Sequence, residues 1–135
     1  MNLVPQILAA YTETDNYLFG QLDDAINSNN SARQASVQDF RRFNDNAYFV
    51  LLWGQLESEI NVKFATVISA GQSHPDWAER RKFYTYNVDK TKFEDRLSLL
   101  LDKQAGKGSA WALAMRYYEH RNKIAHGKAI EPAST

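Results

Sequence analysis

Residues 49–67, FVLLWGQLESEINVKFATV, carry the apolar pattern of a long helix. Its large apolar residues recur at intervals of three or four, the spacing that lines them along one side of an α-helix. This apolar stripe consists of Phe49, Leu52, Trp53, Leu56, Ile60, Phe64 and Val67. The pattern predicts a long amphipathic helix that begins between Ser31 and Asp39 and ends at Gly71, close to Pro75.

The segment before this helix has a regular apolar pattern, whereas the segment after it does not. Residues 3–26 repeat the helical spacing of apolar side chains and predict a first amphipathic helix. The turn-forming sequence NSNNS, residues 27–31, should end that helix. Residues 72–88 lack a regular pattern, and we expect a short helix after Pro75 followed by an irregular aromatic stretch.

Helix-capping residues mark the last third of the chain. The sequence TKFE, residues 91–94, fits a capping box with Thr91 as the cap of a short helix. Ser109 is a suitable cap for a final helix from residue 110 to about residue 126. Gly127 then has the place and residue type of a helix terminator.

The whole chain is expected to be all-α, a single helical bundle of four to five helices over residues 1–135. No alternating strand pattern of useful length is present, and 135 residues with 44% apolar side chains can bury a core. The absence of cysteine excludes disulfides, thiolate zinc sites and a cysteine nucleophile. Without a signal peptide or a membrane-spanning run, we expect a cytoplasmic protein that does not enter a membrane.

Charge is unevenly distributed although the net charge is zero. Residues 1–78 contain 4 basic and 9 acidic side chains, whereas residues 79–135 contain 12 basic and 7 acidic ones. A basic half of this kind can attract a polyanion. The alternatives are a solvated basic face, or a basic surface that meets the acidic surface of another subunit.

Aromatic residues lie beside the basic sequence ERRK at residues 79–82. Trp77, Tyr84 and Tyr86 in this arrangement are typical of side chains that stack on nucleic-acid bases. Packing beneath a long loop is the commoner role of such aromatics, and we expect packing here. Acidic residues do not cluster with His at metal-ligand spacing, so we expect neither a metal site nor a cofactor.

The sequence RNKIAHG, residues 121–127, combines side chains that suit a phosphodiester. On a helix, Asn122 and His126 share a face, and the long side chain of Arg121 can bend towards them. Arg can bind two phosphate oxygens, and His can give or take a proton near neutral pH. RNA carries its own nucleophile, the 2′-hydroxyl. The structural alternative is a helix C-terminus with cationic side chains and a terminating Gly127.

These residues carry a resemblance to a known family. RNKIAHG resembles the Arg-Asn-x-x-x-His motif of the HEPN superfamily (higher eukaryotes and prokaryotes nucleotide-binding domains), helical bundles with this motif towards the end of their last long helix. LLWGQLESEI, residues 51–60, resembles the earlier core helix of that family, where an acidic residue follows an aromatic-rich run. Glu57 fits the acidic position best, and Glu59 is the second choice. The resemblance covers about residues 40–128.

The resemblance implies a catalytic role for four residues. Arg121 would bind and stabilise the phosphate, His126 would transfer protons, Asn122 would orient groups and Glu57 would hold Arg121 in place. Tyr118 would either line the cleft or pack in the core, and we expect packing. The implied activity is a metal-independent endoribonuclease, with a composite active site in which the two motifs of a homodimer face one cleft.

The resemblance also implies partners: an RNA substrate, and a cognate antitoxin or other protein in a toxin–antitoxin or defence system. In the branch regulated by a nucleotidyltransferase antitoxin, a Tyr commonly stands two residues after the His. Lys128 occupies that position here, so we do not expect that regulation. The alternative is a non-catalytic HEPN module that binds a nucleotide, an RNA or a protein.

Overall fold

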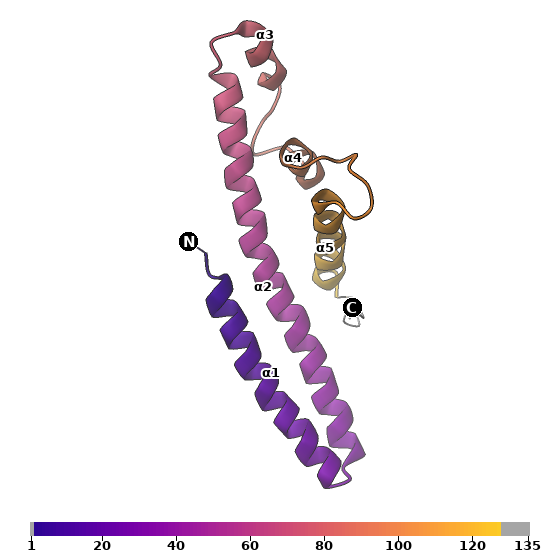
Figure 1. Cartoon of the computed structure of the whole chain (residues 1–135). Helices are drawn as coiled ribbons and strands as arrows, with labels where there is room; N and C mark the ends of the chain where they lie inside the picture. Colours follow the sequence, from indigo (N-terminus) through magenta and orange to yellow (C-terminus); the bar gives the residue numbers. More distant parts are fainter. Residues whose placement is uncertain (1, 128–135) are drawn as a thin grey trace. The chain divides into compact units, whose positions relative to one another are not determined.

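Every regular element of the chain is a helix in the computed structural model, which describes residues 2–127 (Figure 1). The elements are α1 (Val4–Asn27), α2 (Ser31–Gln72), α3 (Trp77–Arg80), a 3-10 turn (Arg81–Phe83), α4 (Phe93–Leu100) and α5 (Ala110–Ala125). The prediction of an all-α chain with four to five helices is therefore confirmed. None of the described helices is long and apolar enough to cross a membrane.

The helices form two compact units. Of the described residues, 2–55 and 119–127 form the hairpin unit, and Leu56–Tyr118 form the central unit. Helices α2 and α5 each contribute residues to both units.

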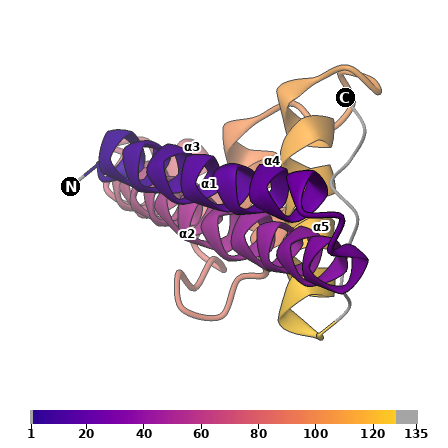
Figure 2. The ribbon, with the colours of Figure 1, turned by 90° about the horizontal axis from the view of Figure 1, so that it is seen from below.

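In the hairpin unit, α1 lies antiparallel along the first half of α2 (Figures 1 and 2). The predicted breaker NSNNS does end α1, since the chain leaves the helix after Asn27 and re-enters one at Ser31. Asn29 adopts a positive φ of 53°, a conformation that asparagine tolerates better than most residues. The Asn30 side chain then accepts a hydrogen bond of 3.0 Å from the N–H of Arg33, which caps the start of α2.

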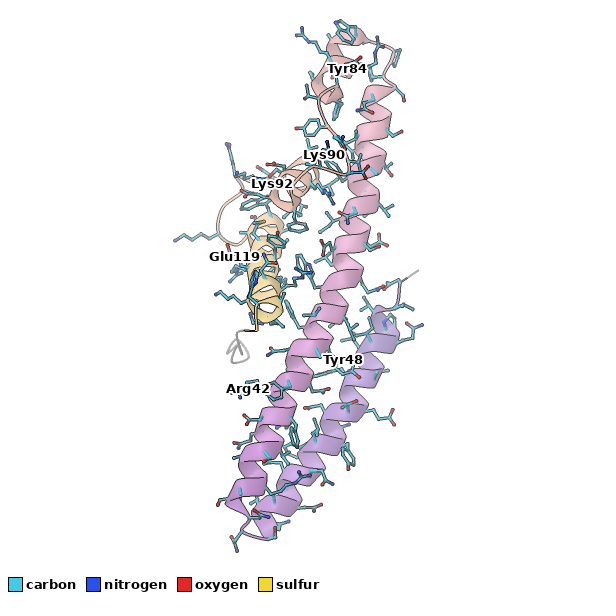
Figure 3. All side chains as sticks on the ribbon, turned by 180° about the vertical axis from the view of Figure 1, so that it is seen from behind. Arg42, Tyr48, Tyr84, Lys90, Lys92 and Glu119 are labelled. Carbon is cyan, nitrogen blue, oxygen red and sulfur yellow. The ribbon has the colours of Figure 1, made fainter. Side chains whose placement is uncertain are left out.

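A polar cluster joins the two helices of the hairpin. The Tyr11 hydroxyl donates a 2.6 Å hydrogen bond to Asp45, and Arg41 forms a 3.1 Å ion pair with Asp15. The hydrogen bond to Asp45, followed by burial, raises the pKa of Tyr11 to about 12. Tyr48 lies on the side of α2 that faces α1 and meets the Tyr11 ring edge-on at 5.5 Å (Figure 3). The buried apolar side chains of this unit are Leu22, Ala25, Val37 and Trp53.

The central unit has its core between the second part of α2, α4 and the first part of α5. Its buried apolar residues are Ile60, Phe64, Ile68, Phe93, Leu97 and Ala114. Arg96 of α4 links three elements of this unit. Its guanidinium donates to Asn61 at 2.6 Å and to the carbonyl of Val88 at 3.0 Å, and it lies over the Phe64 ring. This one side chain therefore fixes α4 and the preceding loop against α2.

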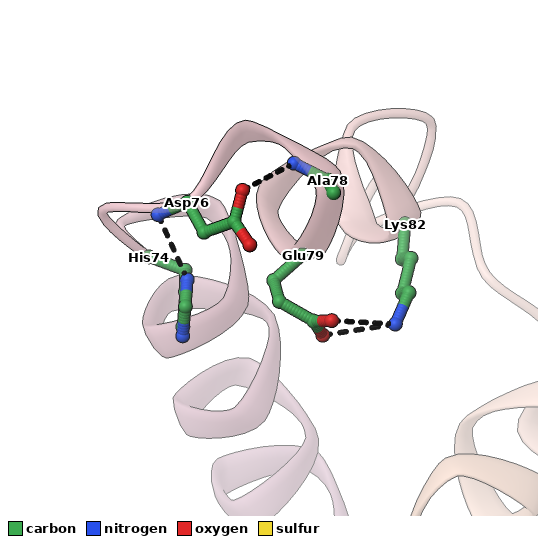
Figure 4. Close-up of polar contacts among 5 residues, drawn as sticks. All are labelled: His74, Asp76, Ala78, Glu79 and Lys82. Carbon is green, nitrogen blue, oxygen red and sulfur yellow. Dashed lines mark hydrogen bonds and ion pairs between the residues drawn. The ribbon is translucent and has the colours of Figure 1, made fainter.

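The end of α2 carries a short folded segment, residues 73–86, which we call the tip. Asp76 caps α3 by accepting a hydrogen bond of 3.0 Å from the N–H of Ala78, and its own N–H donates to His74 (Figure 4). The predicted short helix after Pro75 is thus present. Gln72 donates to the carbonyl of Phe83 at 3.1 Å, so the tip is tied to the last turn of α2.

Two details of the predicted helix pattern are wrong. Thr91 does not cap α4, because Lys92 occupies the cap position and the Thr91 hydroxyl donates back to the carbonyl of Asn87. Leu56, assigned to the buried stripe, is 41% exposed. The cap at Ser109 is confirmed by its 3.1 Å hydrogen bond from the N–H of Ala112.

Candidate functional site

The motif Arg121–His126 occupies the last turns of α5 and the residue just beyond it. The N–H of His126 still donates to the carbonyl of Asn122 at 3.0 Å, so the helical turn reaches His126 although α5 ends at Ala125. Gly127 follows with a φ of 73°, and its N–H donates to the carbonyl of Ile124. This is the left-handed terminator predicted from the sequence, and it stops the helix directly after the imidazole.

Arg121 and Asn122 contact each other, and both are half-buried. The guanidinium of Arg121 donates to the side-chain oxygen of Asn122 at 3.2 Å. His126 is exposed, and its side chain makes no hydrogen bond or ion pair with a described residue. A coincidental motif would be indicated by Arg121 and His126 both buried and separately satisfied, and the structure does not show that arrangement.

His120 holds the end of α5 in the hairpin unit. Its ring meets Phe49 of α2 edge-on, with 4.7 Å between ring centroids, and such pairs stabilise beyond simple burial. The residue precedes Arg121 directly, so this contact helps to fix the direction of the motif. Our interpretation of the sequence did not single out His120, because its contact with Phe49 depends on where α5 meets α2.

Glu57 and Tyr118, the remaining candidates, belong to the central unit, whereas Arg121, Asn122 and His126 belong to the hairpin unit. Glu57 is half-buried on α2. Its role in holding Arg121 stays a prediction. Tyr118 stacks on Phe93 with 4.5 Å between ring centroids, which is the packing role that we expected for it.

The aromatics of residues 77–86 divide into two groups. Tyr86 is half-buried and lies 6.3 Å from the ring of Phe64, as expected for packing beneath a loop. Trp77 and Tyr84 are 54% and 71% exposed, so the packing expected for them is wrong. The one-turn helix α3 directs Trp77 away from the core of its unit, which the sequence pattern did not reveal.

The end of α5 thus presents a permanent cation, an amide that hydrogen-bonds to it and an accessible imidazole. The cation can bind two oxygens of a phosphate or carboxylate anion, and the imidazole can exchange a proton with a neighbouring group. Among residues 2–127, no group of three His, Asp or Glu side chains is placed to hold a metal ion. Comparisons of the chain with protein-family models, curated proteins and solved structures give no match.

Proposed function

We propose that the chain is a metal-independent endoribonuclease of the HEPN type that acts as a homodimer. The observation that carries this proposal is the arrangement at the end of α5. Arg121 hydrogen-bonds to Asn122, and His126 follows one helical turn after Asn122 with its imidazole accessible. These are the residues that the Arg-Asn-x-x-x-His resemblance assigns to catalysis.

The chemistry follows from what each group can do. An RNA 2′-hydroxyl gives its proton to one His126 and attacks the adjacent phosphorus, forming an O2′–P bond. The P–O5′ bond breaks, and the departing 5′-oxygen takes a proton from the partner's His126. Arg121 binds the non-bridging oxygens with its forked guanidinium and stabilises the charge that develops on them. The products are a 2′,3′-cyclic phosphate and a 5′-hydroxyl.

The need for an acid and a base on opposite sides of the phosphate supports a dimer. One copy offers one Arg121 and one His126, and a two-fold axis supplies a second copy of each. Large aromatic side chains on α1 and the first half of α2 remain available for burial: Phe19, Phe40 and Phe43 are 51%, 44% and 55% exposed. Sedimentation should show a dimer at micromolar concentration. A monomer would contradict the composite site.

The activity is tested with a panel of single-stranded and stem-loop RNAs, with and without a metal chelator. Wild type should cleave at least one RNA in both conditions. Arg121→Ala and His126→Ala should each lose activity by about 10²–10⁴-fold, the usual effect of removing a general acid or base. Arg121→Lys should also be poor, because an ammonium cannot bind two phosphate oxygens in one plane.

Separate outcomes test the metal-independent mechanism and the assignment of His126 to the active site. Lys63→Ala is the control, because Lys63 is an exposed cation on α2 in the central unit and lies outside both the motif and the tip. Loss of cleavage in chelator would contradict the metal-independent mechanism. Cleavage that persists in His126→Ala would contradict the assigned site. Failure to cleave any RNA would favour the alternative, a HEPN module that binds RNA, a nucleotide or a protein without catalysis.

A role in a toxin–antitoxin or defence system is part of the same proposal. An RNase that cleaves the RNA of its own host would be harmful unless another component restrained it. Expression in a bacterial host should therefore reduce growth, and His126→Ala should relieve the effect. Equal growth with the two proteins, each shown to accumulate, would contradict this role.

A further inference from the structure

The tip exposes an aromatic corner. Trp77 and Tyr84 meet with 6.0 Å between their ring centroids and 72° between their planes. Tyr84 is 71% exposed and Trp77 54% exposed, and Tyr84 lies at the far end of its unit in Figure 3. Exposure of two large rings is costly unless something stacks on them or covers them.

Short-range contacts hold the corner in place. Arg80 lies over the Trp77 ring at 5.2 Å and donates to the carbonyl of His74 at 2.9 Å. Asp76 caps α3, and Glu79 forms a 2.9 Å ion pair with Lys82 (Figure 4). One face of Trp77 is therefore occupied by a guanidinium, while the ring of Tyr84 remains open to a stacking partner.

The charge around the corner is positive. Between Trp77 and Lys92 the chain has five basic and two acidic side chains. Of the basic ones, Arg81, Lys90 and Lys92 make no side-chain hydrogen bond or ion pair with any described residue. The acidic Glu79 is already neutralised by Lys82.

An open pocket follows the corner along the chain. Its volume is about 660 Å³, and its polar lining includes Thr85, Lys90, Thr91, Lys92, Asp95 and Ser98. Figure 3 shows Lys90 and Lys92 below Tyr84 in the same unit. Two ammonium groups beside the Thr85 hydroxyl suit a phosphate and a ribose, and Asp95 can accept from a sugar hydroxyl.

We propose that the tip and this pocket form a binding site for single-stranded nucleic acid. One base stacks on Tyr84 against the wall made by Trp77, while Lys90 and Lys92 bind the phosphates of the following nucleotides. Proteins that bind single strands without sequence preference usually combine aromatic side chains, on which bases stack, with a positively charged groove that binds the backbone. That the strand is RNA rests on the proposed function; the stacking site itself does not.

The test is fluorescence anisotropy of a labelled single-stranded RNA titrated with the full-length chain, using His126→Ala as the background so that no cleavage occurs. Tyr84→Ala should weaken binding roughly 5- to 150-fold, the loss expected for one base–aromatic stack. Tyr84→Phe should retain most of the affinity because it keeps the ring. Tyr17→Ala is the matched control, an equally exposed tyrosine (67%) on α1, and should bind like the background.

The phosphate-binding lysines have a separate readout. In Lys90→Ala/Lys92→Ala, the slope of log affinity against log salt should fall by about 0.7 for each phosphate that the variant no longer binds. A duplex of the same sequence should bind more weakly than the single strand, since its bases cannot reach Tyr84.

Two results would overturn the proposal. One is RNA binding that is unchanged in Tyr84→Ala. If wild type nevertheless cleaves RNA, that result would contradict this site and leave the proposed function intact. The other is binding to vesicles of phosphatidylcholine and phosphatidylserine that depends on Trp77, with no binding of RNA. That result would assign the corner to a membrane surface. Conversely, Tyr84-dependent binding by a chain that cleaves no RNA would support this site and contradict the proposed function.

Discussion

Replacement of Gly71 by alanine tests how the end of α2 supports the tip. Gly71 is the penultimate residue of α2, and a Cβ at this position would overlap the Phe83 ring at Cγ and Cδ2 and would lie 2.7 Å from Cε2. Because Cγ is the ring's point of attachment, rotation of the ring in place cannot relieve the overlap. Phe83 must leave its rotamer, or the 3-10 turn must move.

The magnitude follows from two opposing effects. Alanine favours an interior helical position over glycine by about 0.8–1.0 kcal/mol, and by less near a helix end. Overpacking typically costs about 1–3 kcal/mol. Phe83 is half-buried, so it can yield in part, and we expect a net loss of about 1–2 kcal/mol in the free energy of unfolding. Gly54 provides the matched control, because no described atom lies within 4 Å of a Cβ there.

The assay is urea denaturation of wild type and of each variant, with and without Phe83→Ala. Gly54→Ala should gain up to about 1 kcal/mol, while Gly71→Ala should lose stability. In the Phe83→Ala background the obstacle is gone, so Gly71→Ala should become neutral or stabilising. A Gly71→Ala variant that is stabilised as much as Gly54→Ala, or that loses the same free energy of unfolding in both backgrounds, would contradict a clash with Phe83.

Two further predictions concern the hairpin unit. Tyr11→Phe removes the hydroxyl that donates to Asp45, and near neutral pH it should lower the free energy of unfolding by about 1 kcal/mol. The raised pKa of Tyr11 means that this stabilisation is fully present below the ordinary value of 10.0 and is lost as the pH rises through about 12. Urea titrations at increasing pH should therefore show wild type and variant converging above pH 10, and a constant gap would contradict the assignment. At the candidate site, Asn122→Asp should cleave RNA more slowly than Asn122→Ala, because a carboxylate would pair with Arg121 and compete with the phosphate. Equal cleavage rates for the two variants would show that Asn122 does not act on Arg121.

The long helix shows how far periodicity predicts burial. Trp53, Ile60 and Phe64 from the predicted stripe are buried, but Leu56 is exposed, and Ile68, which lies outside that stripe, is buried. A spacing of three and four drifts around a straight helix, because 3.6 residues per turn does not divide seven evenly. Over the 42 residues of α2, the buried side of the helix therefore shifts around its axis. A short window of sequence does not show at which residue the shift occurs.

Local chemistry explains the other differences. The Thr91 hydroxyl can bond either to a following helix or to a preceding carbonyl, and it bonds to the carbonyl of Asn87. A sequence motif alone cannot decide between them. Ser109 and Gly127 were predictable because each meets a need of the helix terminus that is independent of tertiary packing.

The helical position of the motif was predictable, because the cap at Ser109 and the terminator at Gly127 mark the two ends of α5. The assignment of Arg121, Asn122 and His126 to a catalytic site stays a prediction. The contact of His120 with Phe49 and the exposure of Trp77 and Tyr84 depend on which elements meet in space. Hydrophobicity predicts burial for a tryptophan, and it cannot show that a one-turn helix turns that side chain outward.

Cleavage of RNA through its own 2′-hydroxyl at Arg121 and His126 can be tested with one pair of substrates. A cleaved RNA is compared, in chelator, with the same RNA carrying a single 2′-deoxy nucleotide on the 5′ side of the cleaved bond. Wild type should leave a 2′,3′-cyclic phosphate and a 5′-hydroxyl on the first RNA and should not cut that bond in the second. Cleavage at the deoxy position, or products with a 5′-phosphate, would contradict this mechanism.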